Sequence, residues 1–236
     1  MRIARFVDLA ACGSIFSDES TFVLRSEIYY RRHYETQHGD AQELQRECPG
    51  HSAEFSSVLL SCWTILDGKE PTEAEWGLFD NSVVALISTP AKVSKFLKNA
   101  FELGDTEQPE SRRLPFLLLE HKAVCYNNRL VEITAENIWN ETVFVKRPEF
   151  RDQKEYRFAL PFSGGLPHHI EAYIFSRDPF KYLETCYANP AMSEESEESE
   201  EQRGTLLHIL LKATGGYGHF QNKKIADFFG NPEIVF

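Results

Sequence analysis

The chain has no apolar run that approaches the roughly 20 residues needed to span a bilayer, so we expect no membrane-spanning helix. Its first residues carry charge too early for a signal peptide. The cysteines are odd in number and lack paired spacing, which disfavours a disulfide framework; they are Cys12, Cys48, Cys62, Cys125 and Cys186. These absences predict a soluble protein of a reducing compartment, the cytoplasm.

Several motifs of well-known enzymes are also missing. The chain contains no Gly-x-Ser-x-Gly elbow and no His-Glu-x-x-His helix, and the glycines at 215–218 lack the Walker spacing. Cys48, His51 and His38 could ligate a metal, but a structural zinc site wants four ligands and no convincing fourth is present. We therefore predict no metal.

Basic residues are fewer than acidic ones, 25 against 36, and the formal net charge is −11. This balance argues against a general electrostatic grip on nucleic acid or on an anionic membrane. Six of the glutamates lie in the run from Ser193 to Glu201, which has no apolar residue and repels itself. We predict a solvated acidic linker over 191–203.

What the sequence does contain is an alternation of strand and helix patterns. It predicts an α+β fold: a single domain over 1–190 with a twisted, largely antiparallel sheet flanked by helices, and a C-terminal helical extension over 204–236. Thr89-Pro90 and Asp178-Pro179 each place a cap before a proline, which favours helices over 90–103 and 178–187. A further helix is expected over 26–37, and strands at 3–6, 56–63, 82–88, 114–126, 142–146, 155–161 and 169–175.

The most informative stretch runs from Phe144 to Leu160, where charged residues alternate with apolar ones. If 155–161 is a strand, Glu155 and Arg157 share one face, and Tyr156 and Phe158 share the other. A carboxylate beside a guanidinium can be a structural ion pair, or it can form one wall of a site for a charged ligand. The residues alone leave both interpretations open.

Short motifs in a set order give the chain a resemblance to a known family. They are Arg5-Phe6, Phe16-Ser17, Ser61-Cys62-Trp63-Thr64, Glu75-Trp76-Gly77-Leu78-Phe79, Val84 to Thr89, and the block from Lys146-Arg147 through Phe150 to Glu155-Tyr156-Arg157. Over residues 1 to 175 this order resembles the family called domain of unknown function 2971. The chain departs from the usual Phe-Asn-Asp-Pro-Phe-Glu segment of that family and has Leu24-Arg25-Ser26-Glu27 instead.

The layout of that family is similar to ADP-ribosyltransferase-like folds, which use NAD. The resemblance implies that Arg5 anchors the nucleotide and that Trp63 or Trp76 flanks the nicotinamide ring. It also implies that Glu155 is the catalytic carboxylate and that Arg157 positions it. A carboxylate at that place would stabilise an oxocarbenium-like transition state at the ribose.

A different class of function fits the same residues. The strands could build a non-catalytic recognition domain, whose charged rim binds a protein or a nucleotide and whose Glu155 and Arg157 form a structural pair. The two hypotheses differ in whether Glu155 and Arg157 line one cavity together with Arg5 and at least one of Trp63 and Trp76.

Overall fold

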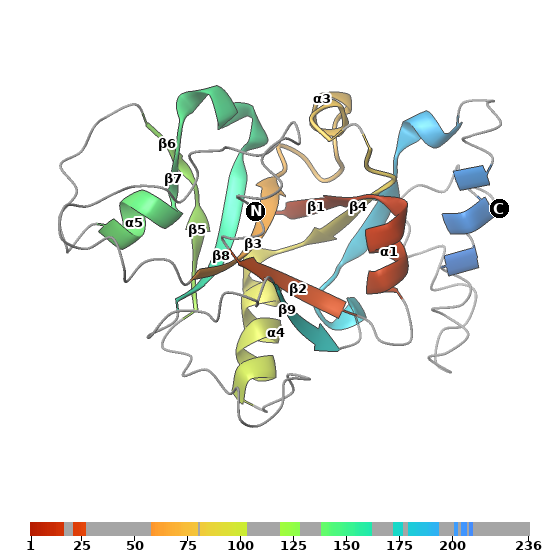
Figure 1. Cartoon of the computed structure of the whole chain (residues 1–236). Coiled ribbons are helices and arrows are strands. Elements are labelled where there is room, and N and C mark those ends of the chain that lie inside the picture. Colours follow the sequence, from red (N-terminus) through yellow and green to blue (C-terminus); the bar gives the residue numbers. More distant parts are fainter. Residues whose placement is uncertain are drawn as a thin grey trace. The chain divides into compact units, whose positions relative to one another are not determined.

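The computed structural model describes residues 1–16, 21–26, 58–79, 81–102, 119–127, 138–161, 172–176, 179–193, 201–202, 204–206 and 208–209 (Figure 1). The chain divides into two compact units, each assembled from separate segments. Unit 1 comprises Met1–Phe22, Leu66–Leu97 and Phe175–Phe236, and unit 2 comprises Val23–Ile65 and Lys98–Ile174. Helices and mostly antiparallel strands occur together, so the predicted α+β class is confirmed.

Unit 1 contains three antiparallel strands in the order β10-β4-β1. Strand β4 (Val84–Ser88) lies in the middle, and all five of its residues are buried. Such a strand needs apolar residues on both faces, which explains why its sequence does not alternate. Strands β1 (Ile3–Val7) and β10 (Thr185–Ala188) pair with its two edges.

The helices of this part of the chain begin at side-chain caps. The Asp8 carboxylate accepts the Ala11 N–H at 2.7 Å at the start of α1 (Leu9–Ile15). Thr72 and Glu75 form a capping box at α3 (Glu73–Gly77). Thr89 Oγ1 accepts the Lys92 N–H at 3.3 Å beside Pro90, where α4 (Pro90–Glu102) begins as predicted.

The apolar stripe of α4 forms part of the core of unit 1. Val93, Phe96 and Leu97 are buried, as the sequence pattern predicts. The Phe96 ring lies 5.5 Å from that of Phe22 and 4.7 Å from that of Tyr182, measured between centroids. Through these contacts Phe96 packs α4 against the rest of the unit 1 core.

Unit 2 is built around two long antiparallel strands, β3 (Val58–Ile65) and β8 (Glu155–Pro161). β5 (Glu120–Ala123) pairs with the outer edge of β8, and β2 (Thr21–Ser26) pairs with β3 through Arg25 and Ser26. β9 (Ala172–Ser176) follows β2 in the order of strands. Beyond β5, β6 (Cys125–Tyr126) and β7 (Val145–Lys146) form a short parallel pair.

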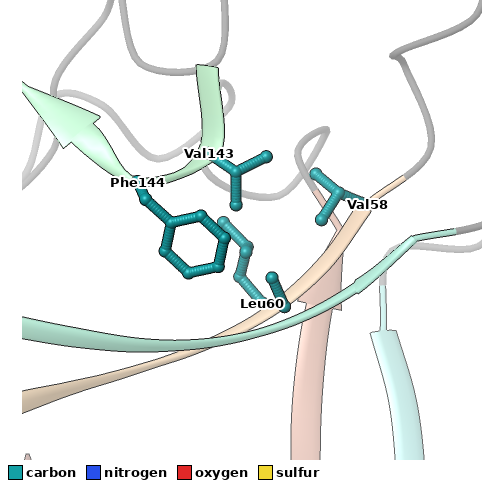
Figure 2. Packing of buried hydrophobic residues seen from close by; sticks show 5 residues of the cluster. Val58, Leu60, Val143 and Phe144 are labelled. Atoms are coloured by element: carbon teal, nitrogen blue, oxygen red, sulfur yellow. The ribbon is translucent and has the colours of Figure 1, made fainter. Parts of the chain in front are cut away.

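A small apolar cluster covers one face of β3 and β8. The short helix α5 (Ile138–Val143) lies beside β5 in Figure 1 and delivers Val143 and Phe144 to this face. Figure 2 shows both side chains against Val58 and Leu60, and Ala159 completes the buried set. The cluster therefore fixes the chain directly before β7, the strand that carries Lys146.

Two local predictions need correction. Residues 142–143 end helix α5, so the strand predicted at 142–146 is reduced to β7. The helix predicted over 178–187 is only a 3-10 turn at Pro179–Lys181, followed by β10. In the second place tertiary contacts override local propensity, because Glu184 N–H donates to Ile87 O and β10 completes the edge of β4.

Other predictions fall wholly or partly outside the described residues. These include the helix at 26–37, the strand at 114–118 and most of the acidic run and C-terminal extension. Two further 3-10 helices, η2 (Pro148–Gln153) and η4 (Pro190–Ser193), complete the described elements, and residues 201–202, 204–206 and 208–209 are helical. The domain boundaries at 190 and 203 stay predictions.

Candidate functional site

The register of β3 and β8 decides which charged residues share a surface. Directly paired residues in antiparallel strands point to the same face, and successive residues alternate. Thr64 pairs with Glu155 and Cys62 with Arg157, while Lys122 of β5 pairs with Arg157 from the other side. Glu155 and Arg157 thus lie together on one face, as the alternation predicted.

The two side chains form a buried ion pair with two hydrogen bonds. Arg157 Nε donates to Glu155 Oε1 at 2.6 Å, and Nη2 donates to Oε2 at 3.1 Å. Arg157 is 0% exposed and Glu155 is 6% exposed. Such a pair has lost its hydration, so it depends on complete hydrogen bonding to offset the cost of burial.

Lys146 adds a second cation to this pair. Its Nζ lies 3.1 Å from Glu155 Oε2 and donates to Gln153 Oε1 at 2.8 Å. Burial alone lowers the pKa of Lys146, but its neighbours, with the Glu155 carboxylate first, act in the opposite direction. Together they hold the pKa above its ordinary value. Lys146 is therefore a charged member of what we call the Glu155 network: Lys146, Glu155 and Arg157.

Backbone and tyrosine groups complete the Glu155 network. Arg157 Nη1 donates to Val143 O at 2.6 Å, at the end of α5. The Glu155 N–H donates to Tyr126 Oη at 2.7 Å. Burial raises the pKa of Tyr126 to about 12, against the effect of that donor, so Tyr126 stays a neutral phenol at neutral pH. The network thereby joins β6, β7, β8 and α5.

A partly exposed segment, η2, adjoins the buried Glu155 network. η2 leaves β7 at Arg147 and returns to β8 through Lys154, whose φ of 44° lies in the left-handed region. Arg147 and Glu149, with side chains 42% and 54% exposed, form an ion pair at 2.8 Å. The cations of Lys146 and Arg147 lie 5.0 and 5.2 Å from the Phe150 ring centroid. The buried network thus lies beside a partly exposed rim of mixed charge, Arg147 to Asp152, in which Glu149, Arg151 and Asp152 are exposed.

Trp63 is in the same unit, but it lies on the other face of the sheet. It pairs with Tyr156 in the register, and its Nε1–H donates to Ser61 Oγ at 3.0 Å. Its side chain is buried. The structure therefore brings Glu155 and Arg157 together and keeps Trp63 on the opposite side of β3 and β8.

Arg5 and Trp76 belong to unit 1. Arg5 pairs with Leu86 on β1, whereas Trp76 packs against Phe6, with ring centroids 5.0 Å apart. Phe6 and Arg5 are successive strand residues, so Trp76 covers the face of β1 that Arg5 does not occupy. The predicted convergence of both residues with Glu155 stays a prediction.

Sequence reasoning missed a pair of polar residues on the Trp63 face. His121 Nδ1 lies 2.7 Å from Tyr156 Oη, and the His121 ring centroid lies 5.3 Å from that of Phe158. Burial, and then the charge of Lys98, lowers the pKa of His121. The register between β5 and β8 brings the two side chains together, and no local sequence motif predicts it.

The described residues hold no group of three or more histidine, cysteine or acidic side chains that could bind a metal. In that same part of the chain, no helix is long and apolar enough to cross a membrane. No protein-family model matches the chain, and neither a curated protein nor a solved structure is significantly similar to it. The family resemblance and the NAD cofactor accordingly stay predictions.

Proposed function

We propose that this protein is a non-catalytic recognition domain whose η2 rim binds a charged protein or nucleotide ligand. The observation that supports this proposal is the engagement of the Glu155 carboxylate. Three N–H donors of Arg157 and Lys146 hold it in a buried position. In this proposal Glu155 fixes the base of the rim and does not touch the ligand.

The NAD-dependent transferase makes a different demand on the same carboxylate. It requires a Glu155 oxygen to face the ribose as positive charge develops there. An oxygen already committed to two buried cations stabilises added positive charge less, because its negative charge is largely compensated. For this reason the geometry supports the recognition role better.

We also propose a reducing, cytoplasmic setting and a ligand other than bulk nucleic acid. Four described cysteines, Cys12, Cys62, Cys125 and Cys186, are free thiols, which supports the setting. The net charge of −11 supports the second point.

The test combines ligand selection with charge reversal on the rim. Peptides selected from a displayed random library, together with NAD, ADP-ribose and ATP, are measured for equilibrium binding to the full chain. We expect a selected ligand to lose at least tenfold in affinity on Arg147→Glu combined with Arg151→Glu. Lys95→Glu is the control, because Lys95 is an exposed cation on a different element, α4.

Release of nicotinamide from NAD, measured with the full chain, is the result that would contradict the proposal. If the full chain releases nicotinamide and a folded Glu155→Gln variant does not, Glu155 is catalytic and the transferase is correct. Ligands that respond to Lys95→Glu but not to the rim variants also contradict a role for η2.

A further inference from the structure

The edge of the sheet in unit 2 holds one titratable pair that the Glu155 network does not use. His121 is on the edge strand β5 and is half-buried, and Tyr156 is on β8 and is nearly buried. The two are joined through His121 Nδ1 and Tyr156 Oη at 2.7 Å. This side-chain hydrogen bond adds to the four residue pairs through which the short edge strand β5 is attached to β8.

The direction of this hydrogen bond follows from the alternatives open to the hydroxyl. Among the described residues, the other acceptor near Tyr156 Oη is the His121 carbonyl oxygen, at 3.5 Å, the long limit of a hydrogen bond. Two arrangements fit the 2.7 Å distance, and the one that gives this nearly buried hydroxyl its better acceptor has the hydroxyl donate to Nδ1. That arrangement requires the neutral His121 tautomer with its proton on Nε2.

Protonation of His121 changes Nδ1 from a hydrogen-bond acceptor into a donor. The imidazolium carries N–H at both nitrogens, so Nδ1 stops accepting and the Tyr156 hydroxyl loses its good acceptor. Lys98 on α4 repels the new charge. Among the described neighbours on β5 itself, Glu120 and Lys122 point to the opposite face.

A change in β5 can affect the Glu155 network, because the residues that directly follow β5 are hydrogen-bonded to that network. Val124 N–H donates to Glu155 O at 2.8 Å, and Asn127 N–H donates to Lys146 O at 3.2 Å. Tyr126, between them, accepts the Glu155 N–H. A looser β5 therefore loosens the segment that supports Lys146 and η2.

We propose that the His121–Tyr156 pair is an acid-sensitive latch that holds β5 closed while His121 is neutral and releases it when His121 is protonated. The link from the latch to ligand binding rests on the proposed function of the η2 rim. The latch itself does not.

The experiment measures the histidine tautomer by nitrogen NMR and the amide-exchange protection of Lys122 and Val124, from neutral pH to well below 6.5. We expect the Nε2–H tautomer at neutral pH and a loss of protection of about fivefold to tenfold in acid. Tyr156→Phe, which removes only the hydroxyl, should abolish this acid-dependent loss. An Nδ1–H tautomer, or the same acid-dependent loss in Tyr156→Phe, overturns the latch.

Binding of a selected rim ligand separates the two proposals. If protection falls in acid while no ligand binds at any pH, the latch is correct and the recognition role fails. If ligands bind and the protection of β5 does not change with pH, the latch fails alone. Weaker binding in acid in the wild type, but not in Tyr156→Phe, supports both.

Discussion

At the residue scale, the Glu155 carboxylate is the anion that two buried cations share. Glu155→Gln keeps the shape, but it leaves Arg157 and Lys146 buried without their anion. We expect the free energy of unfolding to fall by about 3 kcal/mol, the range found when one partner of a buried pair is removed. Urea denaturation measures this loss.

Glu149→Gln is the matched control, because Glu149 pairs with Arg147 at the exposed rim. Its effect should stay within about 0.5 kcal/mol. Equal and small losses in both variants would show that the Glu155 network contributes little to stability.

The cysteines should differ sharply in their reactivity with an alkylating reagent. Burial, with the negative charge of Asp8, raises the pKa of Cys12 to about 12, and burial holds the pKa of Cys186 well above its ordinary value. Cys125 is exposed. In the native protein we expect iodoacetamide to modify Cys125 at least tenfold faster than Cys12 and Cys186, as measured by peptide mass spectrometry.

Denaturant should remove that difference, because unfolding exposes all three thiols equally. Rapid native labelling of Cys12 would contradict its place in the core.

At the scale of elements, the short helix α3 is stabilised mainly by the capping box at its N-terminus. The Glu75 carboxylate accepts from Thr72 N–H, Thr72 Oγ1 and Asp67 N–H, at 2.7, 2.9 and 3.2 Å. Thr72→Ala removes one of these donors and the acceptor for Glu75 N–H. We expect a loss of about 1 kcal/mol in the free energy of unfolding.

Glu73→Gln serves as the comparison, since Glu73 is exposed in the same turn. A loss of similar size there would mean that helix charge, and not the cap, stabilises α3.

Elements with a strong local signal could be predicted from the sequence, and those made by long-range contacts could not. β8 has the predicted bounds, and α4 begins at the predicted Pro90, because alternation and a cap with proline are local. β10 was predicted as helix because its partner, β4, is about a hundred residues away. Only the pairing turns that segment into a strand.

The candidate site divides in the same way. Strand period placed Glu155 and Arg157 on one face from sequence alone. The hydrogen bond from Lys146 to Glu155 depends on the path of η2 and on the parallel pairing of β6 and β7. No local sequence pattern encodes either of these. The side on which Trp63 lies likewise depends on the register with β8.

At the scale of the whole molecule, the acidic run contributes a large share of the negative charge. Its residues 194–200 alone contain five glutamates and no apolar residue. We predict that their deletion changes the melting temperature by no more than about 2 °C, because such a composition has little apolar surface to bury. Differential scanning calorimetry of the deletion variant and the full chain measures this shift.

A scrambled run of the same composition is the control for chain length. A fall of many degrees on deletion, but not on scrambling, would show that the length of this segment supports the fold.

The interleaving of the two units has a consequence for synthesis on the ribosome. β3 leaves the ribosome about ninety residues before β8, its main partner. At roughly 5–20 residues per second, this apolar strand waits on the order of 5 to 20 s for the chain that covers it. During that interval its backbone can pair with a neighbouring nascent chain. The demand on chaperones is therefore set by the order of segments along the gene, in a way that the stability of the finished protein does not reveal.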